Sequence, residues 1–265
     1  MKRLGARVYF ICSYLRYTYL AKGLHRIHSP FVFHFYKHIL LGKVHIPVSS
    51  KIESIRKRMR IDNSVFSCEE YGAGSLYSRS SVRKVKNIAK RSLKSNKLAQ
   101  LLYRLVYYQQ PTYILDLGTS LGITTAYQAS AVPNSFFYTF EGCSSILTYA
   151  NQIFQELKLN HIKSVQGNLD HTLKSLITQI PQVDYVFFDA NHQFYSTMSY
   201  FLICLEKAHE HTVFVFDDIH YSPEMSRAWR KIKEHDRVSI TIDLFFIGIV
   251  FFKTTQVKQD FILRC

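Results

Sequence analysis

The most constraining feature of this sequence is the alternation of short apolar runs with amphipathic stretches after Pro111. Runs rich in Val, Ile, Phe and Tyr predict strands at residues 113–118, 136–141, 162–167, 183–190 and 212–218. Helical spacing of the apolar residues between them predicts helices at residues 124–130, 144–159, 170–179 and 193–209. Continuous apolar strands that alternate with helices are typical of a parallel sheet covered on both faces. The sequence therefore predicts an α/β fold.

The end of the chain departs from this alternation. A helix is predicted at residues 222–235, because Ser222 and Pro223 form a typical helix start. Two strands, at residues 238–246 and 247–253, then follow with almost no spacer. Strands joined so closely pair as a hairpin, so the last one is expected to run antiparallel to its neighbours. Dinucleotide-binding folds usually end with another parallel strand, so this ending disfavours them.

The part of the chain before Pro111 has a helical and basic character. Residues 94–110 predict a helix that leads into the first strand, residues 1–70 predict further helices, and residues 72–75 indicate a flexible loop. We therefore expect an N-terminal helical extension and loop at residues 1–93, followed by the sheet domain at residues 94–265. The composition is 47% apolar, which supports a real core. The apolar runs are shorter than the about 20 residues that a membrane span needs.

The charge and the cysteine content indicate which binding partners and which cell compartment suit this protein. The net charge of +15 would attract nucleic acid, anionic lipid or an acidic substrate, and much of it lies in residues 51–60 and 79–97. Those segments lack the interleaved aromatic residues of a base-stacking platform, which disfavours RNA. Residues 1–20 lack a signal-peptide pattern and predict an amphipathic helix, for which weak contact with a membrane surface stays open. Five scattered cysteines predict neither a disulfide framework nor a zinc cluster, which fits a cytoplasmic location.

A glycine turn follows the first predicted strand. Asp116 ends the strand, and the turn then contains Gly118, Thr119, Ser120 and Gly122. The two glycines allow the backbone to turn tightly and to approach a ligand. Ser120 stands where a dinucleotide-binding turn has its middle glycine, and the carboxylate of Asp116 would repel a pyrophosphate. A ligand that carries an ammonium and a sulfonium group, such as S-adenosylmethionine (SAM), would be attracted instead.

Two more polar residues mark the ends of the next strands. Glu141 ends the second strand about 20 residues after Gly122, where an acidic group typically binds a pair of ribose hydroxyls. Asn168 follows the third strand and could hydrogen-bond an adenine edge, with capping of the next helix as its alternative role. The glycine turn, Glu141 and Asn168 all lie at carboxyl ends of strands, which is where open α/β sheets bind ligands.

These residues, together with Asp189-Ala190-Asn191-His192 and Asp217-Asp218, resemble the class I SAM-dependent methyltransferases over residues 94–253. The resemblance is strongest to the O-methyltransferase branch that includes catechol and caffeoyl-CoA O-methyltransferases. It implies a Rossmann-like seven-stranded sheet of order 3-2-1-4-5-7-6 with the seventh strand antiparallel, in agreement with the hairpin above. It also implies that SAM is bound by Asp116, Gly118, Thr119, Ser120, Gly122, Glu141, Asn168 and Asp189.

Three carboxylates are expected to meet at the ends of the fourth and fifth strands. Asp189, Asp217 and Asp218 would repel one another without a counter-charge, which Mg²⁺ or another divalent cation would supply. The family usually has Asp, Asp and Asn at these positions, so Asp218 departs from its pattern. His192 follows Asp189 closely and is the expected catalytic base that takes the acceptor's proton, with Asp189 as its catalytic partner and His220 as the second candidate.

The expected function is transfer of a methyl group from SAM to a hydroxyl oxygen of a small or medium-sized acceptor. RNA methylation is a weaker alternative, because residues 189–192 lack the Pro-Pro-aromatic turn usual in nucleic-acid N-methyltransferases of this fold. A protein that binds SAM without turnover is the other alternative. The sequence carries no pattern that identifies the acceptor or the oligomeric state.

Overall fold

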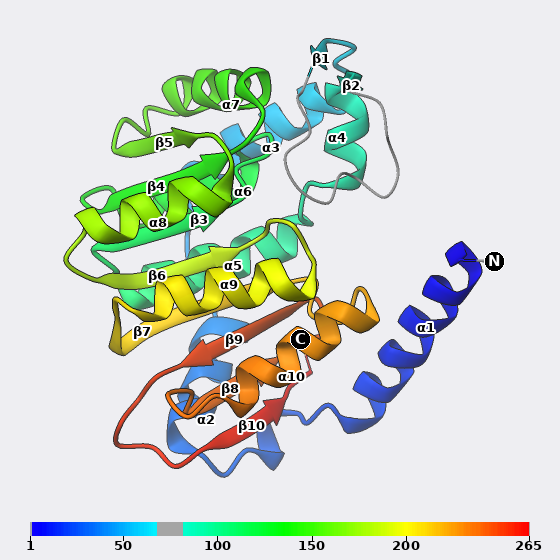
Figure 1. Cartoon of the computed structure of the whole chain (residues 1–265), viewed down its shortest axis with the longest axis vertical. Coiled ribbons are helices and arrows are strands. Elements are labelled where there is room, and N and C mark those ends of the chain that lie inside the picture. The colour runs from blue at the N-terminus through cyan, green and yellow to red at the C-terminus, as the bar shows by residue number, and fades with distance from the viewer. Residues whose placement is uncertain (1, 68–81, 265) are drawn as a thin grey trace. The chain divides into compact units, whose positions relative to one another are not determined.

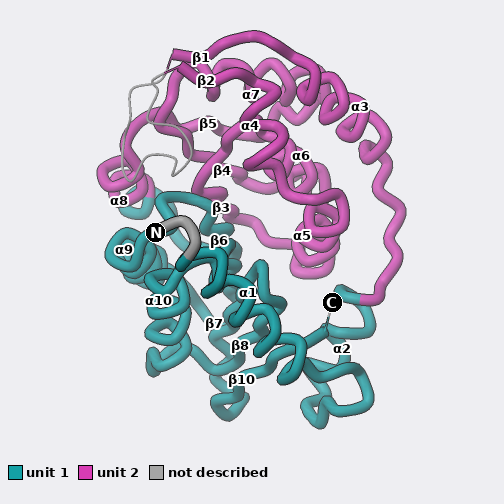
Figure 2. The backbone as a smooth tube through the Cα atoms, turned by 90° about the vertical axis from the view of Figure 1, so that its right-hand side faces the viewer, with its two compact units in different colours: residues 1–40, 177–265 teal, residues 41–176 magenta. Residues whose placement is uncertain are grey.

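The structure, a computed structural model, describes residues 2–67 and 82–264. The predicted loop at residues 72–75 and Cys68 lie outside the described residues, as does the beginning of the basic segment 79–97. The chain divides into two compact units (Figure 2): unit 1 comprises residues 1–40 and 177–265, and unit 2 comprises residues 41–176. The domain boundary predicted after residue 93 thus falls inside unit 2, and the first helices belong with the C-terminal strands.

Unit 2 contains three parallel strands in the order β3, β4, β5, with helices around them (Figure 1). Its strands also include a short antiparallel pair, β1 and β2. The strands are β1 (Val65–Ser67), β2 (Val82–Lys84), β3 (Tyr113–Leu117), β4 (Phe136–Glu141) and β5 (Ile162–Gln166). The helices are α3 (Ser49–Met59), α4 (Val85–Arg91), α5 (Asn96–Gln109), α6 (Ile123–Ser130), α7 (Ser144–Glu156) and the first part of α8 (Leu169–Gln179).

Helix α5 illustrates how the sequence sets these elements. The hydroxyl oxygen of Ser95 accepts a hydrogen bond from the N–H of Leu98 (3.3 Å) and caps the start of the helix. Gln110 adopts a left-handed conformation (φ 46°) directly before Pro111 and ends it. The buried face of α5 is apolar and packs against α6. The predicted helix at residues 94–110 is therefore confirmed, and it delivers the chain to β3.

Unit 1 contains five strands in the order β6, β7, β9, β8, β10. The pairs β6–β7 and β8–β10 are parallel, whereas β9 is antiparallel to both β7 and β8. The strands are β6 (Val183–Phe188), β7 (Ala208–Asp217), β8 (Ile240–Asp243), β9 (Ile247–Phe251) and β10 (Gln259–Ile262). The helices are α1 (Lys2–Leu20), α2 (Pro30–Phe35), α9 (Phe194–Leu205) and α10 (Pro223–Glu234), with a 3-10 turn at Leu24–Arg26 and a π-helical turn at Tyr36–Leu40.

The predicted strand order is confirmed within each unit. Counting β3 as the first predicted strand, unit 2 contains strands 1, 2 and 3 in sequence, and unit 1 contains strands 4, 5, 7 and 6 with the seventh antiparallel. The prediction of seven strands was wrong, because an additional strand, β10, pairs with β8. Its sequence is short and half polar, so no apolar run announces it, and it is held through backbone pairing.

Helices cover both faces of β9 in unit 1. Trp229 of α10 packs directly on Gly248, where a Cβ would lie only 2.7 Å from the indole ring. Phe31 and Phe35 of α2 pack edge-to-face on Phe251, with ring centroids 5.0 and 5.9 Å away. Positions 248 and 251 point to opposite faces of the strand. The buried antiparallel strand therefore has helical cover on each side, as its wholly buried pattern requires.

The N-terminal residues of unit 1 are tied to the C-terminal strand. The N–H of Lys22 donates to the carbonyl of Ile262 (2.8 Å), and the N–H of Arg264 donates back to the carbonyl of Lys22 (3.0 Å). The hydroxyl of Tyr36 donates to the carbonyl of Arg264 (2.8 Å). The first part of the predicted helical extension, residues 2–40, is thus mostly helical and is docked on β10. Residues 65–67 and 82–84 of the extension are a correction, because they form the strand pair β1 and β2 instead of helix.

Cysteine bonding differs from the expectation at one position. Cys12 and Cys204 are free thiols, but Cys143 is disulfide-bonded. Spacing along the chain does not tell which cysteines a fold brings together, and this bond could not be read from the sequence. Among the described helices, none combines the length and the apolar character needed to cross a bilayer.

Candidate active site

The turn after β3 is built from left-handed residues. Gly118 (φ 117°), Ser120 (φ 48°) and Gly122 (φ 79°) lead the chain from the end of β3 into α6. The N–H of Gly122 donates to the carbonyl of Thr119 (2.9 Å) and closes the turn. A Cβ on Gly122 would lie 2.8 Å from the ring of Phe154 on α7. Glycine is therefore required there both by the conformation and by the close approach of α7.

Asp116 lies at the base of this turn and is fully buried. Its Oδ2 accepts hydrogen bonds from the hydroxyls of Thr125 on α6 (2.6 Å) and Thr139 on β4 (2.8 Å). The hydroxyls of Thr139 and Thr119 also share a hydrogen bond (2.6 Å). A buried carboxylate needs donors of this kind to offset the loss of water. Asp116 thus joins β3, β4 and α6 to the turn, and its contact with an ammonium group stays a prediction.

Glu141 borders the same turn from the end of β4. Its Oε2 accepts a hydrogen bond from the N–H of Ser120 (2.9 Å), and its Oε1 accepts one from the N–H of Cys143 (3.1 Å). Burial raises the pKa of this carboxyl, while the backbone N–H donors and the charge of Arg83 partly oppose the rise. The predicted ribose-binding carboxylate therefore lies beside the glycine turn in unit 2, with its position fixed by backbone groups.

Asn168 directly precedes α8, and its loop meets the end of β4. The N–H of Gly167 donates to the carbonyl of Glu141 (3.1 Å), which joins the two loops. The side-chain oxygen of Asn168 accepts a hydrogen bond from the N–H of Asp170 (2.9 Å), and its carbonyl accepts one from the N–H of Thr172 (3.0 Å). This is the capping role that the sequence left open. A contact with adenine stays a prediction, for which the amide nitrogen is the suitable donor.

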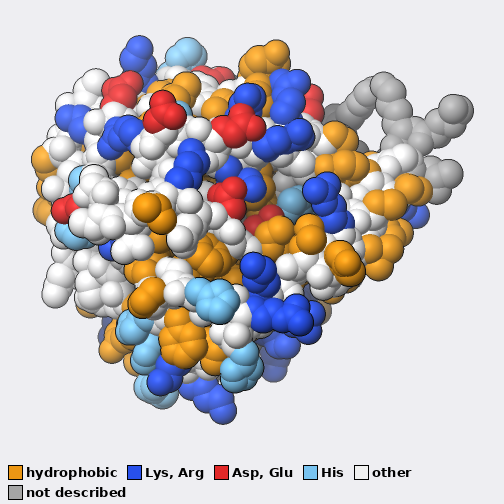
Figure 3. All heavy atoms as spheres, turned by 90° about the horizontal axis from the view of Figure 1, so that it is seen from below, with side chains coloured by type: hydrophobic (Ala, Val, Ile, Leu, Met, Phe, Trp, Pro, Cys, Tyr) orange, Lys and Arg blue, Asp and Glu red, His pale blue; other side chains and the backbone are white. Residues whose placement is uncertain are grey.

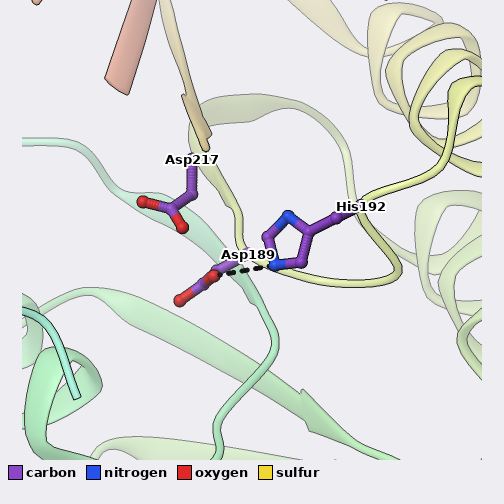
Figure 4. Close-up of side chains that lie close together, drawn as sticks. All are labelled: Asp189, His192 and Asp217. Carbon is purple, nitrogen blue, oxygen red and sulfur yellow. Dashed lines mark ion pairs between the residues drawn. The ribbon is translucent and has the colours of Figure 1, made fainter. Parts of the chain in front are cut away.

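Unit 1 carries a second group of functional residues at the ends of two neighbouring parallel strands. Asp189 follows β6, Asp217 ends β7, and Phe188 pairs with Phe216 in the register between them. Candidate ligand atoms of Asp189, His192 and Asp217 all lie within 4.8 Å of one another. Figure 4 shows the His192 imidazole facing the Asp189 carboxylate, with 3.5 Å between Nε2 and Oδ1. The structure therefore brings together three of the predicted residues.

These three side chains differ in burial. Asp217 is buried, with 1% of its surface exposed, while the side chains of Asp189 and His192 are 15% and 31% exposed. A base must be reachable by its substrate, and His192 is the most accessible member of the group. Two carboxylates this close also attract a cation or a proton, because their charges repel each other in a partly buried site.

Asp218 and His220 are placed elsewhere. Asp218 has a left-handed backbone (φ 54°), donates its N–H to the carbonyl of Phe246 (2.7 Å), and is not a member of the group that includes Asp217. The Nε2 of His220 lies 2.7 Å from Oδ2 of Asp243, and its ring stacks on Phe245. His220 therefore has a carboxylate partner of its own, at a different position from the Asp189 group.

The glycine turn and the acidic strand ends lie in a part of the chain that matches a known protein family. Residues 115–219, which contain both groups of residues, match the family model for a methyltransferase domain. The resemblance found in the sequence is thereby confirmed. No protein of curated function matches the sequence significantly.

Solved structures share the fold of this chain over most of its length. The O-methyltransferase from Bacillus cereus in complex with SAH, the demethylated product of SAM, has a TM-score of 0.57 at 16% identity, covering 83% of this chain and 97% of that one. An SAH-bound methyltransferase from Podospora anserina has a TM-score of 0.60 at 12% identity, covering 86% and 97%. The O-methyltransferase TomG from Streptomyces achromogenes, in complex with SAM, has a TM-score of 0.54 at 21% identity, covering 61% and 82%. The Rossmann-like α/β fold is confirmed by these matches.

The sequence did not predict the residues that support the candidate site. Thr125 and Thr139 were not predicted, although their hydroxyls hold Asp116. Tyr200 was also missed, and its hydroxyl accepts a hydrogen bond from the amide of Asn191 (3.0 Å) in the loop that carries His192. Each of these residues lies inside a helix or strand, where a polar residue is not unusual. Only Thr125 could have been found from the sequence, because it lies on α6 one turn beyond Gly122.

Proposed function

We propose that this protein is a methyltransferase that binds SAM at the glycine turn of unit 2 and transfers its methyl group to a hydroxyl oxygen of a small or medium-sized acceptor. The observation that carries the proposal is the group formed by Asp189, His192 and Asp217. An imidazole held near a carboxylate is the usual general base for a hydroxyl proton near neutral pH. The names of the Bacillus cereus and Streptomyces achromogenes neighbours, both O-methyltransferases, support oxygen as the acceptor atom.

SAM binding is supported by the geometry of unit 2. Gly118, Ser120 and Gly122 all have positive φ, as in the glycine turns at strand ends that commonly bind a ligand. In the proposal this turn, including Thr119, holds the methionine part and Glu141 accepts hydrogen bonds from the ribose hydroxyls. The amide of Asn168 binds adenine. Asp116 acts beneath the turn by keeping its shape and by supplying negative charge near the ammonium group.

The chemical step is an in-line displacement at the methyl carbon. A bond forms between the acceptor oxygen and the methyl carbon while the bond from that carbon to the sulfonium sulfur breaks, which leaves a neutral thioether. The hydroxyl proton passes to the imidazole of His192, and Asp189, which faces Nε2 of that ring, stabilises the resulting imidazolium. Most of the acceleration comes from alignment of donor and acceptor.

The donor set of the Asp189 group fits a divalent cation. Two carboxylates and an imidazole within 4.8 Å of one another are ligands that such ions accept, and the carboxylate oxygens suit Mg²⁺ or Mn²⁺. In the proposal Asp189 and Asp217 would hold the ion, and His192 remains free to take the proton. The bound ion would lower the pKa of the acceptor hydroxyl. Asp218, expected as the third ligand, is left out because it is not a member of this group.

A titration and a variant pair test this function. Calorimetry with S-adenosylhomocysteine, with and without Mg²⁺ or Mn²⁺, should show binding, and transfer from SAM should be measured on a panel of hydroxyl acceptors. We expect His192→Gln to keep the affinity for S-adenosylhomocysteine and to reduce turnover about 100-fold or more. His211→Gln is the matched control, since His211 is exposed at the other end of β7.

Three results would contradict the proposal. Absence of any affinity for S-adenosylhomocysteine would exclude the SAM site. Binding without transfer to any acceptor would favour a SAM-binding protein without turnover. Transfer that requires RNA and falls steeply with salt would move the acceptor to nucleic acid.

A further inference from the structure

Helix α1 is fixed to unit 1 by one of its faces. Phe10, Tyr14 and Tyr17 surround the ring of Phe245, with centroid distances of 5.2, 4.9 and 5.4 Å. The hydroxyl of Tyr17 also donates to the carbonyl of Leu263 (2.5 Å). Phe245 is itself buried. The inner face of the helix is therefore settled by packing within the unit, and this fixes which side chains point outward.

The opposite face of α1 carries an apolar stripe in water. Val8, Ile11, Leu15 and Tyr19 follow one another at intervals of three or four residues, which places them on one side of a helix. They are 52%, 57%, 61% and 88% exposed, respectively. We call these four residues the outer stripe. Aliphatic and aromatic side chains gathered in this way normally mark a surface that meets a partner.

The charge around the outer stripe has a single sign. Helix α1 contains no acidic residue, and the first one in the chain is Glu53. Arg7 and Arg16 are exposed on the helix, and in the described part of the chain no ion pair involves either of them. On the face drawn in Figure 3, hydrophobic side chains lie at the surface among Lys, Arg and His side chains, and Asp and Glu side chains are visible elsewhere on that face. The partner of this helix should therefore be both apolar and anionic.

We propose that the outer stripe of α1 is a binding site for the surface of an anionic lipid bilayer. A 19-residue helix with an apolar stripe and a basic border lies in the plane of the interface, with the stripe among the acyl chains and Arg7 and Arg16 at the headgroups. Nucleic acid fits less well, because Val, Ile and Leu offer bases no stacking surface. A second copy of the helix fits less well too, because it would bring like charges together.

Vesicle binding by the full-length protein tests this inference. Vesicles of phosphatidylcholine alone and with about one third phosphatidylglycerol are compared by flotation, and we expect binding only to the anionic vesicles. Ile11→Gln with Leu15→Gln should weaken that binding about tenfold or more, because it removes the aliphatic part of the stripe without changing charge. The matched control is Ala6→Gln with Ser13→Gln, at an exposed and a half-buried position on the other side of the same helix, and it should bind like the wild type.

A second pair of variants tests whether positive charge on α1 contributes to vesicle binding. Arg7→Gln with Arg16→Gln should weaken binding to anionic vesicles about tenfold, since each arginine near such a surface is favourable. Lys57→Gln with Lys90→Gln removes the same charge from exposed positions of α3 and α4 and should change binding by less than about twofold. Circular dichroism and the melting temperature check that all variants fold.

Several outcomes would overturn the inference. Equal binding to neutral and anionic vesicles, or none to either, would exclude a lipid surface. Unchanged vesicle binding by the Ile11→Gln, Leu15→Gln variant would exclude the stripe as its site. A dimer in light scattering that this variant abolishes, without vesicle binding by the wild type, would assign the stripe to a second copy. None of these measurements depends on methyl transfer.

Discussion

At the scale of single residues, the buried carboxylate of Asp116 depends on two hydroxyl donors. Replacing Thr125 with valine keeps the shape of the side chain but removes the 2.6 Å hydrogen bond to Oδ2. We expect Thr125→Val to lower the free energy of unfolding by about 1–3 kcal/mol, because the buried carboxylate loses one of its two hydroxyl donors. Urea denaturation followed by circular dichroism measures the change.

The adjacent residue supplies the control for this prediction. Thr124 is on the same helix and only half buried, whereas Thr125 is 1% exposed. Thr124→Val should change the free energy of unfolding by less than about 0.5 kcal/mol, as substitutions away from buried polar networks usually do. If both variants lost the same stability, the hydrogen bond to Asp116 would not be the cause.

Glu141 gives a prediction for the pH dependence of stability. Burial raises its pKa in the folded protein above the unfolded value of about 4.3. The protonated form is therefore favoured by folding, so its contribution to stability is present below the unfolded pKa and is lost as the pH rises through the folded pKa. We expect the free energy of unfolding of the wild type, relative to Glu141→Gln, to fall over this pH range and then to level off. Urea denaturation of both proteins at a series of pH values measures it, and a difference that rose with pH would contradict the sign.

At the scale of elements, the junction between β3 and α6 depends on Gly122. A Cβ at this position meets the Phe154 ring at 2.8 Å and must adopt φ 79°. We expect Gly122→Ala to lower stability by about 1–3 kcal/mol, from backbone strain and from displacement of α7. Gly23→Ala is the control, because Gly23 has φ −89° and open space around a Cβ. Calorimetric melting compares the two, and equal melting temperatures would show that the turn tolerates a side chain.

The elements differ in how well the sequence predicts them, for a physical reason. Strand β4 is found at its predicted bounds, residues 136–141, because its apolar run is bounded by a turn and a helix start. Helices α5 and α10 carry clear caps at Ser95 and Ser222. The strand β10 and the pair β1 and β2 carry no such signal, since they are short and stabilised by partners distant in the sequence. Local patterns cannot report such pairing.

The candidate site was likewise predictable from the sequence only in part. The glycine turn and the acidic strand ends were predictable, because a parallel sheet brings carboxyl ends to one edge. The exact membership of the group formed by Asp189, His192 and Asp217 was not predictable, since Asp218 is outside it and the loop to α9 brings His192 in. Side-chain direction at a strand end depends on one or two dihedral angles that the residue types leave open. The spacing of motifs therefore predicts which part of the sheet carries the site, but not which side chains are in contact there.

At the scale of the whole molecule, the charge is strongly unbalanced. The chain has 34 Lys and Arg against 19 Asp and Glu, and the first acidic residue is Glu53. A net charge of +15 destabilises any compact state through self-repulsion, because folding brings the charges closer together. Dissolved salt screens charges that are exposed and more than a Debye length apart. The stability of this chain should therefore depend on ionic strength in a defined direction.

We expect the melting temperature to rise by about 2–4 °C when NaCl is increased from about 0.05 to 0.5 M, which corresponds to about 1 kcal/mol for a chain of this size. The effect should be smaller in Lys57→Gln with Lys90→Gln, since two positive charges are gone while both positions are exposed and free of core contacts. Choline chloride at the same ionic strength should act like NaCl, because screening does not depend on the cation. A melting temperature that fell with salt would mean that attractive pairs, such as Arg58 with Glu156, outweigh the repulsion.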